Sequence, residues 1–594
     1  MKKHTLLSFS LFCFIIIFGH VSNAQNLPIG LAPDEIADIP AYAQSRHLVS
    51  SGITTPPNFP VRSMAEWEEI QALVITWTQY QATLKEIVRY AQEECTVIIV
   101  CSDSNQVKSY LSSNGITVNN VEFIEDDYDS VWMRDYGANT VYQNEVDSLI
   151  LVDWIYNRPR PDDDILPERL ASHIGAPIYT TTVAPYDLVH TGGNYMSDGF
   201  GTGFSSKLVI EENGVGGQFN QTPKSESEIN AIMDEFMGID RYVLMDVLPY
   251  DGIHHIDMHM KLLDEETLLI GEYPTGQADG PQIEANLQYV LSNYNSMFGT
   301  PYKIARIEMP PDGNGNYPDQ GPNWNPGDYR TFTNSVIVNK TVLVPTYDEQ
   351  YDTTALRIYR DNMPGYRVVG IDCNNIIQAS GAIHCITKAV GVEDPLLISH
   401  QEISDITVPI SDYEINAFVK HRTGLSNVKL YYTADTSIGY QDVMMILSDS
   451  INSTWTGFIP NQTAGSTIYY YIDATANSGK NQVRPMTAPG GFWKFKVLVN
   501  AGTVSLDYSS INMEPVFPNP ASAITCIPIS SSEKVEISLR LLDVLGREVQ
   551  SVFTGSVPVG RSNYFFHAYQ LLPGTYILEM RSDNGIETQK IMIK

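Results

Sequence analysis

The chain has 594 residues and a formal net charge of −32 at pH 7. One compact core rarely serves a chain this long, so two to four domains are expected. The excess of acidic residues argues against nucleic acid and anionic membrane as partners. It favours solubility and the attraction of cationic ligands.

Residues 1–24 are typical of a secretory signal. Two lysines precede an apolar run over residues 6–18, and small residues lead to Ala24, after which cleavage is expected. The run is short for a membrane anchor, and no other segment approaches the ~18 apolar residues that a spanning helix needs. We therefore expect an exported protein with no membrane span.

Residues 40–395 alternate strand-like and helix-like runs, which predicts a mixed α and β domain. Strands are expected at residues 72–77 and 96–100, and between them the apolar residues 84, 87, 88 and 91 recur at helical spacing. Later helices are expected over residues 226–236, 281–297 and 351–362. Five hairpin-like pairs are each led by a polar residue: Asp135, Asn194, His255, Asn334 and Cys385. A repeat of roughly fivefold order would bring these residues around one axis, although spacing this irregular also arises by chance.

Two β-rich modules follow. Residues 396–502 contain short alternating strands, such as 428–432 and 468–472, and predict an immunoglobulin-like β-sandwich. Residues 513–594 contain Phe-Pro-Asn-Pro at 517–520, Val-Glu-Ile-Ser-Leu at 535–539 and Leu-Pro-Gly-Thr-Tyr at 572–576. With these segments the module resembles the C-terminal sorting domain of the type IX secretion system. That resemblance implies a small β-sandwich, a secreted or cell-surface destination and the type IX machinery as a partner.

Residues 254–260 alternate polar and apolar side chains. A strand here would place His255, Asp257 and His259 on one face. Such a face is either solvated or, because two histidines and a carboxylate are acceptable zinc ligands, a metal site.

Residues 126–135 gather four carboxylates around Trp132. Such a loop is usually solvated or binds a cation. Trp132 also suits a flat cationic ligand, because its ring can stack on the cation while Asp135 accepts the ligand's N–H groups.

Five cysteines lie beyond the predicted signal, an odd and scattered set that implies no disulfide framework. Cys385 follows the small residues of 380–382 and is either a buried, inert thiol or a nucleophile. A nucleophilic thiolate needs a lowered pKa or a nearby base. His384 would point away from Cys385 in a strand, so a histidine distant in sequence is the better partner.

Four motifs occur in order across these residues: Trp-Met-Arg-Asp at 132–135, His-Thr-Gly-Gly-Asn at 190–194, His-Ile-Asp at 255–257 and Ile-His-Cys-Ile-Thr at 383–387. Together they resemble the bacterial, Porphyromonas-type peptidylarginine deiminases and the related agmatine deiminases. The resemblance implies a pentein fold, a five-bladed α/β propeller of ββαβ-like units around a pseudo-fivefold axis. The two β-rich modules resemble the secreted peptidylarginine branch.

The resemblance also implies the roles of the site residues. A guanidinium is planar and rich in N–H donors, so two carboxylates, Asp135 and Asp257, suit it as a clamp. Cys385 would attack the guanidinium carbon, and His255 would protonate the departing ammonia and then activate water. Asn334 completes the expected catalytic set. The chemistry requires neither a metal nor another cofactor.

Arg158 and Arg160 bear on the choice of substrate. In the peptidylarginine branch the matching pair resembles residues that bind the α-carboxylate of a C-terminal arginine; otherwise they are surface charges separated by prolines. We therefore expect hydrolysis of peptidyl-arginine to peptidyl-citrulline and ammonia. The alternatives are an agmatine deiminase, a catalytically silent surface adhesin that keeps the fold, and a metallohydrolase.

Overall fold

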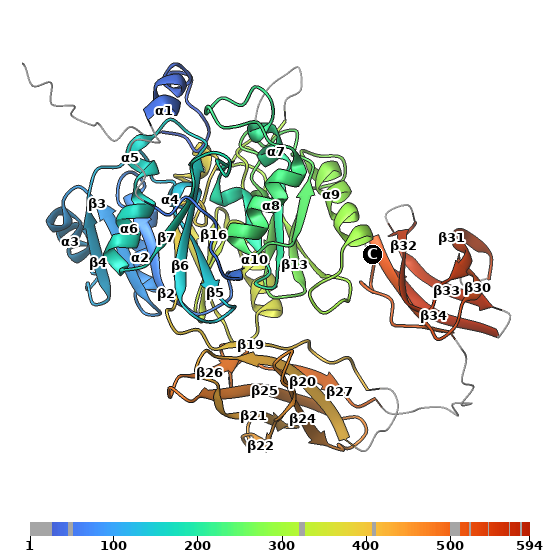
Figure 1. Cartoon of the computed structure of the whole chain (residues 1–594). Helices are drawn as coiled ribbons and strands as arrows, with labels where there is room; N and C mark the ends of the chain where they lie inside the picture. The colour runs from blue at the N-terminus through green and yellow to red at the C-terminus, as the bar shows by residue number, and fades with distance from the viewer. Residues whose placement is uncertain are drawn as a thin grey trace, which may run out of the picture.

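The computed structural model describes residues 27–45, 52–319, 327–406, 412–498, 511–521, 524–543, 546–568, 571–582 and 585–594. The predicted signal at 1–24 and the predicted boundary at residue 502 lie outside the described residues. An α/β body is followed along the chain by two regions built of antiparallel sheets (Figure 1). None of the helices within the described residues has the length and apolar character needed to cross a membrane.

One connection recurs five times in the α/β body: two antiparallel strands, a helix, and a third strand that runs parallel to the second. The five units are β5 (Asn139–Gln143), β6 (Leu149–Tyr156), α6 (Leu166–Ile174) and β7 (Ile178–Thr181); β9 (Met196–Ser197), β10 (Thr202–Ser206), α8 (Glu226–Met237) and β11 (Arg241–Met245); β12 (Met260–Leu262), β13 (Thr267–Glu272), α9 (Gly280–Asn293) and β14 (Lys303–Glu308); β15 (Val336–Val338), β16 (Thr341–Thr346), α10 (Glu349–Asn362) and β17 (Arg367–Asp372); and β18 (Lys388–Gly391), β2 (Ile70–Thr76), α2 (Gln81–Ala91) and β3 (Thr96–Cys101).

The fifth unit joins the two ends of the body, because β18 pairs antiparallel with β2, which lies more than 300 residues earlier, with Lys388 opposite Val74. The polar residues that lead the predicted hairpins, from Asp135 to Cys385, each stand within five residues of the first strand of a unit. The recurring connection therefore gives all five the same position in their units, as the spacing suggested.

Further elements complete the body: η1 (Glu35–Ala37), α1 (Ile39–Ser45), β1 (Val61–Ser63), α3 (Ser104–Ser113), β4 (Val121–Glu125), α4 (Met133–Tyr136), α5 (Pro161–Asp164), β8 (Val189–His190), η3 (Gly192–Asn194), α7 (Leu208–Asn213), η4 (Ile256–Met258) and η5 (Ile377–Ala379). The helices form where apolar residues recur at helical spacing, as in α2, which buries Leu84, Ile87, Val88 and Ala91. The helix α8 begins with a capping box between Ser225 and Glu228.

The strand expected around His255 is not formed. His254 has a positive φ of 59°, and residues 256–258 form η4 instead. The Asp251 carboxylate accepts hydrogen bonds from the backbone N–H groups of Ile253 and His255, at 3.1 and 3.0 Å. These bonds hold the chain in a turn, so side-chain alternation cannot apply before β12 begins at Met260.

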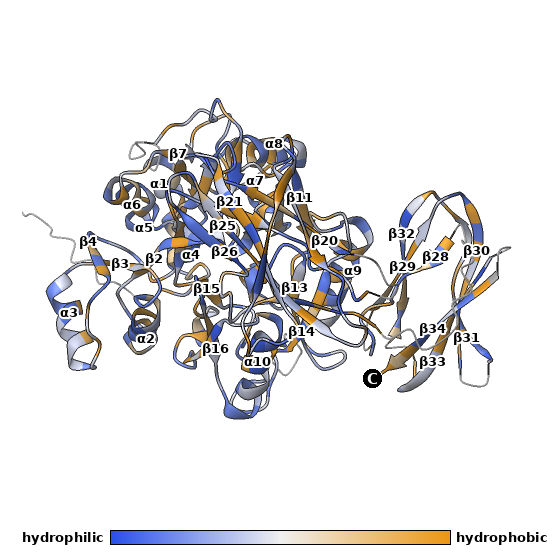
Figure 2. Ribbon diagram, turned by 90° about the horizontal axis from the view of Figure 1, so that it is seen from below, coloured by the Kyte–Doolittle hydropathy of each residue, from blue (hydrophilic) through white to orange (hydrophobic). Residues whose placement is uncertain are grey.

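The region after the body has two antiparallel sheets. One contains β19 (Leu397–Ser399), β20 (Asp412–Lys420), β24 (Thr454–Pro460) and β23 (Ile446–Asp449), and the other contains β22 (Gln441–Met444), β21 (Leu425–Thr433), β25 (Thr467–Ala476), β26 (Asn481–Arg484) and β27 (Trp493–Lys496). Buried and part-exposed residues alternate along β25, and Figure 2 shows apolar and polar residues interleaved along these strands. The inward residues of both sheets share one apolar core.

The last region is also built from two antiparallel sheets around its own core. The first holds β28 (Ile511–Met513), β29 (Ile524–Ser531) and β32 (Gly560–His567), and the second holds β31 (Glu548–Val557), β30 (Val535–Leu542), β33 (Gly574–Ser582) and β34 (Gly585–Ile593).

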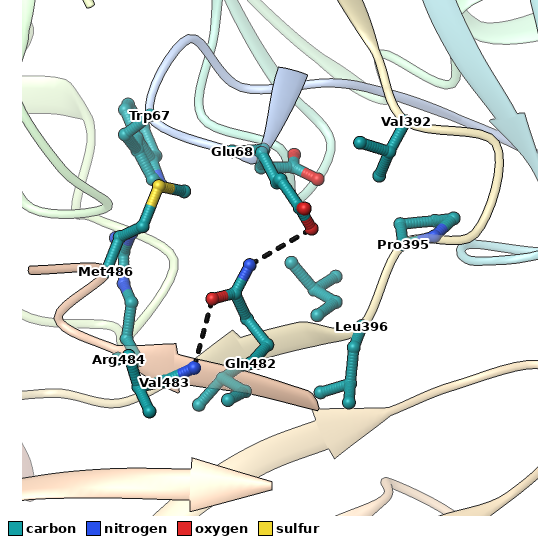
Figure 3. A pocket seen from close by; sticks show the side chains of 12 residues that line it. Trp67, Glu68, Val392, Pro395, Leu396, Gln482, Val483, Arg484 and Met486 are labelled. Carbon is teal, nitrogen blue, oxygen red and sulfur yellow. Dashed lines mark hydrogen bonds between the residues drawn. The ribbon is translucent and has the colours of Figure 1, made fainter. Parts of the chain in front are cut away.

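Ion pairs join the middle region to the body: Lys480 lies 2.6 Å from Glu69, and Arg484 lies 3.0 Å from Glu265. Figure 3 shows a pocket at this junction, where Gln482 Nε2 donates to Glu69 Oε2 at 3.1 Å. None of the predicted catalytic residues lines this pocket. They lie instead just before the first strands of the five units.

Candidate active site

Cys385 lies between η5 and β18 and has no exposed surface. Asn334, from the start of the fourth unit, donates from Nδ2 to the Cys385 sulfur at 3.1 Å. Its Oδ1 accepts from the backbone N–H groups of His384 and Cys385, at 3.0 and 3.3 Å. One amide therefore fixes both the loop and the sulfur, which supports including Asn334 in the predicted site.

Asp257 also lies near the thiol, and His384 contacts Asp257. The Asp257 Oδ2 atom is 3.7 Å from the Cys385 sulfur and 2.7 Å from Nδ1 of His384. The other ring nitrogen of His384 is 2.5 Å from Glu66 Oε1. His384 therefore contacts Asp257 and Glu66 through its two ring nitrogens, as expected of a histidine that is not the direct partner of the thiol.

Sequence reasoning missed Glu66. Its carboxylate also accepts from Lys261 at 2.5 Å and from Arg134 at 3.3 Å. Burial alone would raise the pKa of Glu66, but His384, Lys261 and Arg134 together hold it well below its usual value. No motif marks a lone glutamate more than 300 residues before the cysteine, so no signal in this sequence could have found it.

Asp135 and His255 form a second cluster. The Asp135 Oδ1 atom lies 3.6 Å from Nδ1 of His255 and accepts from the Gly193 N–H at 3.1 Å. A Cβ added to Gly193 would lie 2.5 Å from the His255 ring, so only glycine permits this approach. This close approach explains why residue 193 of the 190–194 motif is a glycine.

Burial dominates the electrostatics of the site. It raises the pKa of Asp135 to about 7, with a further contribution from the charge of Asp257. Burial and the same two carboxylates raise the pKa of Cys385 well above its usual value. Burial lowers the pKa of His255 far below its usual value, and the charge of Arg158 adds to this effect. Without a bound cation, the thiol is therefore protonated and the imidazole is neutral at pH 7.

Several buried polar atoms of the described site have no hydrogen-bond partner: both ring nitrogens of His255 and Oδ1 of Asp257. Orphaned buried acceptors are costly, and in native proteins they usually face a ligand or a catalytic task. Two carboxylates, a neutral imidazole and a thiol together match the donors and the carbon of a guanidinium.

His259 follows η4 as its C-cap and is buried, and neither of its ring nitrogens has a hydrogen-bond partner. Across the residues that the structure describes, no group of three or more His, Cys, Asp or Glu side chains is arranged to hold a metal ion.

The three predicted substrate-binding residues are all buried. Trp132 lies against Gly381, where an added Cβ would come within 2.4 Å of the indole ring, and this places the ring beside the Cys385 loop. Arg158 and Arg160 are only 7% and 1% exposed, so the interpretation as surface charges is wrong. All three side chains donate hydrogen bonds to residues near the start of the described chain.

Comparisons with known proteins show the family of the chain. The sequence profile of the Porphyromonas-type peptidyl-arginine deiminases matches residues 62–390, more than half of the chain. The profile of a secretion system C-terminal sorting domain matches residues 515–594.

Two provisionally named agmatine deiminases, from Legionella pneumophila (strain Paris) and Vibrio parahaemolyticus, are 24% and 23% identical to the chain. The alignments cover 56% and 57% of this chain and 96% and 98% of those proteins. An X-ray structure of another provisionally named agmatine deiminase matches with a TM-score of 0.50 at 18% identity, covering 58% of this chain and 100% of that one. The agmatine deiminase of Enterococcus faecalis matches with a TM-score of 0.48 at 17% identity, covering 57% and 99%.

The structural matches concern the fold, whereas the profile match covers all four motifs and every predicted site residue. The sorting domain indicates a secreted or cell-surface protein. The chain therefore belongs to the Porphyromonas-type peptidyl-arginine deiminase family, and it is a guanidino-group deiminase with a C-terminal secretion sorting domain.

Proposed function

We propose that the protein hydrolyses the guanidinium of peptidyl-arginine, most readily at a C-terminal arginine, to peptidyl-citrulline and ammonia. One observation carries the proposal: the Cys385 sulfur lies against Asn334 and Asp257, while His255 and Asp257 keep unpartnered polar atoms in the same buried site.

In the first half-reaction, Asp135 and Asp257 bind the N–H groups of the guanidinium. The bound cation offsets the two carboxylate charges that raise the pKa of Cys385, so the thiol ionises more readily when substrate is present. The thiolate attacks the guanidinium carbon to form a C–S bond. His255, whose imidazole is neutral beforehand, takes the proton that the thiol loses and supplies it to the departing nitrogen, so that the C–N bond breaks, ammonia leaves and a covalent thiouronium remains on Cys385.

In the second half-reaction, His255 takes a proton from water as the water oxygen attacks the same carbon. The C–S bond then breaks, the sulfur leaves as thiolate, and the ureido product is released. Asn334 donates a hydrogen bond to the sulfur and steadies the loop that carries it through both steps.

Arg158 and Arg160 favour a peptide ending in arginine over agmatine. Each guanidinium can bind a carboxylate through two N–H groups, and agmatine has no carboxylate. The family's name points the same way. The names of the relatives from Legionella and Vibrio favour agmatine instead, and this is the competing substrate.

The remaining parts of the chain fit an exported enzyme. We propose a signal peptide at residues 1–24, a pentein catalytic domain at 40–395, an immunoglobulin-like domain at 396–502 and a type IX sorting domain at 513–594. The fivefold recurrence of one connection and the separate cores of the later regions support this division.

The test is ureido product formed from four substrates: a peptide with a C-terminal arginine, a peptide with an internal arginine, agmatine and free arginine. We expect the highest kcat/KM for the C-terminal arginine peptide. Preference for agmatine would overturn the peptide assignment, and no turnover of any of the four would overturn the deiminase mechanism.

A further inference from the structure

The first described residues lie directly on the candidate active site. Residues 27–35 are named here the N-terminal strap. They precede α1, which lies over the end of the body that carries α4 and α5 (Figure 1). The carbonyl groups of the strap face the three side chains predicted to bind substrate.

The contacts are specific. The Leu27 carbonyl accepts from Trp132 Nε1 at 2.9 Å, and the Ile29 carbonyl accepts from Arg158 Nε at 2.9 Å. The carbonyls of Pro28 and Gly30 both accept from Arg160 Nη2, at 2.8 and 3.1 Å. Four successive backbone acceptors thus engage Trp132, Arg158 and Arg160.

Glu35 supplies the charge in this arrangement. Its two carboxylate oxygens accept from Nε and Nη2 of Arg160 at 2.7 and 3.0 Å, a two-point contact with a side chain that is 1% exposed. Among the side chains that the structure describes, Glu35 is the only carboxylate hydrogen-bonded to Arg160. A substrate carboxylate would need the same donors.

An apolar anchor holds the strap down. Ile29 is fully buried in the main core of the α/β body, and its N–H donates to the Ala379 carbonyl at 3.3 Å, six residues before Cys385. The strap therefore closes the site from the Cys385 loop across to Arg160.

We propose that the N-terminal strap is an intramolecular inhibitor that competes with the substrate for Arg158 and Arg160 and covers Cys385. This inference deepens the proposed function, on which it rests for the identity of the substrate. Because substrate binds only when the strap has left, the apparent affinity is lowered by the fraction of molecules in which the strap is displaced.

The test compares Glu35→Gln with the unaltered full chain. The substitution removes the charge that pairs with Arg160 but keeps the size of the side chain. We expect about a tenfold increase in kcat/KM for a peptide ending in arginine, because losing a charged hydrogen-bonded contact shifts an equilibrium by about ten- to a hundredfold. Asp34→Asn is the matched control: this neighbouring carboxylate is exposed, makes no cap hydrogen bond, and should leave the rate unchanged.

A second readout is independent of the substrate. Alkylation of Cys385 by iodoacetamide, followed on the peptide that contains it, should also be about tenfold faster in Glu35→Gln than in the unaltered chain and Asp34→Asn. Ile29→Ala, which removes the apolar anchor but keeps the backbone carbonyl that accepts from Arg158, should act in the same direction and replaces Glu35→Gln if that variant fails to fold.

Unchanged alkylation in both strap variants would overturn the proposal. Faster alkylation with reduced turnover would also overturn it, because the strap would then complete the substrate site rather than block it. Failure of the proposed function is distinguishable, because it would abolish turnover in every variant while leaving the alkylation comparison intact.

Discussion

Two buried ion clusters flank the candidate active site, and they differ in where their carboxylates come from. Glu66 balances Arg134, Lys261 and His384, and all four residues belong to the α/β body. Arg160 is balanced by Glu35, which begins η1 near the start of the described chain, before the first strand of the body.

The Glu66 carboxylate is a fixed part of the fold, whereas the Glu35 carboxylate can be replaced by another carboxylate. Removing Glu66 would leave the buried cations Arg134 and Lys261 unpaired, since Glu66 is the carboxylate that pairs with each of them among the residues that the structure describes. Removing Glu35 exposes donors that an incoming carboxylate can satisfy. We therefore expect substitutions in the Glu66 cluster to lower stability and activity. Substitutions in the Arg160 cluster should instead change whether the strap or the substrate binds to Arg160.

The largest effect is expected where chemistry depends on one atom. Cys385→Ala should abolish turnover while the fold survives, because the thiol contributes the attacking sulfur and little packing volume. Citrulline formation measured with stoichiometric enzyme checks this. Residual activity above about one percent of the unaltered enzyme would be incompatible with a covalent intermediate on Cys385.

Glu66→Gln removes the charge that pairs with Arg134, Lys261 and His384. We expect kcat to fall by roughly ten- to a hundredfold, because His384 loses the partner that orients it towards Asp257. Stability should fall by about 3–5 kcal/mol, the usual cost of leaving buried charge unpaired. Denaturant unfolding and steady-state kinetics measure the two effects, and a variant with unchanged stability and rate would show that the cluster is dispensable.

Some of these residues could be predicted from the sequence, and others could not. Short motifs marked Asp135, His255, Asp257 and Cys385, because each is a reactive side chain in a distinctive local pattern. The spacing of the leading polar residues suggested a repeat but was too irregular to establish one. Glu66 has no local pattern, and its role follows from contacts with Lys261 and His384, which are distant in sequence. The turn at His254 depends on a hydrogen bond to Asp251, so side-chain alternation alone suggested a strand there.

Substitution of Arg158 or Arg160 tests the cluster whose carboxylate partner can be exchanged. Each alanine substitution should lower kcat/KM for peptides ending in free arginine by roughly ten- to a hundredfold, because a charged hydrogen bond contributes about 1.5–3 kcal/mol. Amidated peptides never made the contact, so their kcat/KM should not fall, and it should rise as far as the substitution also releases the N-terminal strap. Equal losses on both peptides would mean that the pair supports the fold rather than selecting the substrate.

The smallest effect concerns stability and pH, and it distinguishes the two carboxylates Asp135 and Glu66. Folding raises the pKa of Asp135 to about 7, whereas an exposed aspartate in the unfolded chain titrates near 3.9. Between these values the folded state binds the extra proton, so its contribution is fully present below about pH 4 and is lost as pH rises through 7. The lowered pKa of Glu66 acts with the opposite sign, since its contribution is present at neutral pH and is lost as the solution is acidified.

Asp135→Asn should therefore raise Tm by a few degrees at pH 8 and leave it nearly unchanged at pH 4, because the neutral amide removes the cost of ionising a buried carboxyl. Thermal unfolding of the substrate-free protein at the two pH values measures this. Glu66→Gln is the internal contrast: it should lower Tm at pH 8 and lower it less at pH 4, where the native carboxylate is closer to protonation. If both substitutions shifted Tm equally at the two pH values, the opposite pKa directions assigned to these carboxyls would be wrong. The contrast between a carboxyl that awaits a cation and one that already holds three partners would then lose its electrostatic basis.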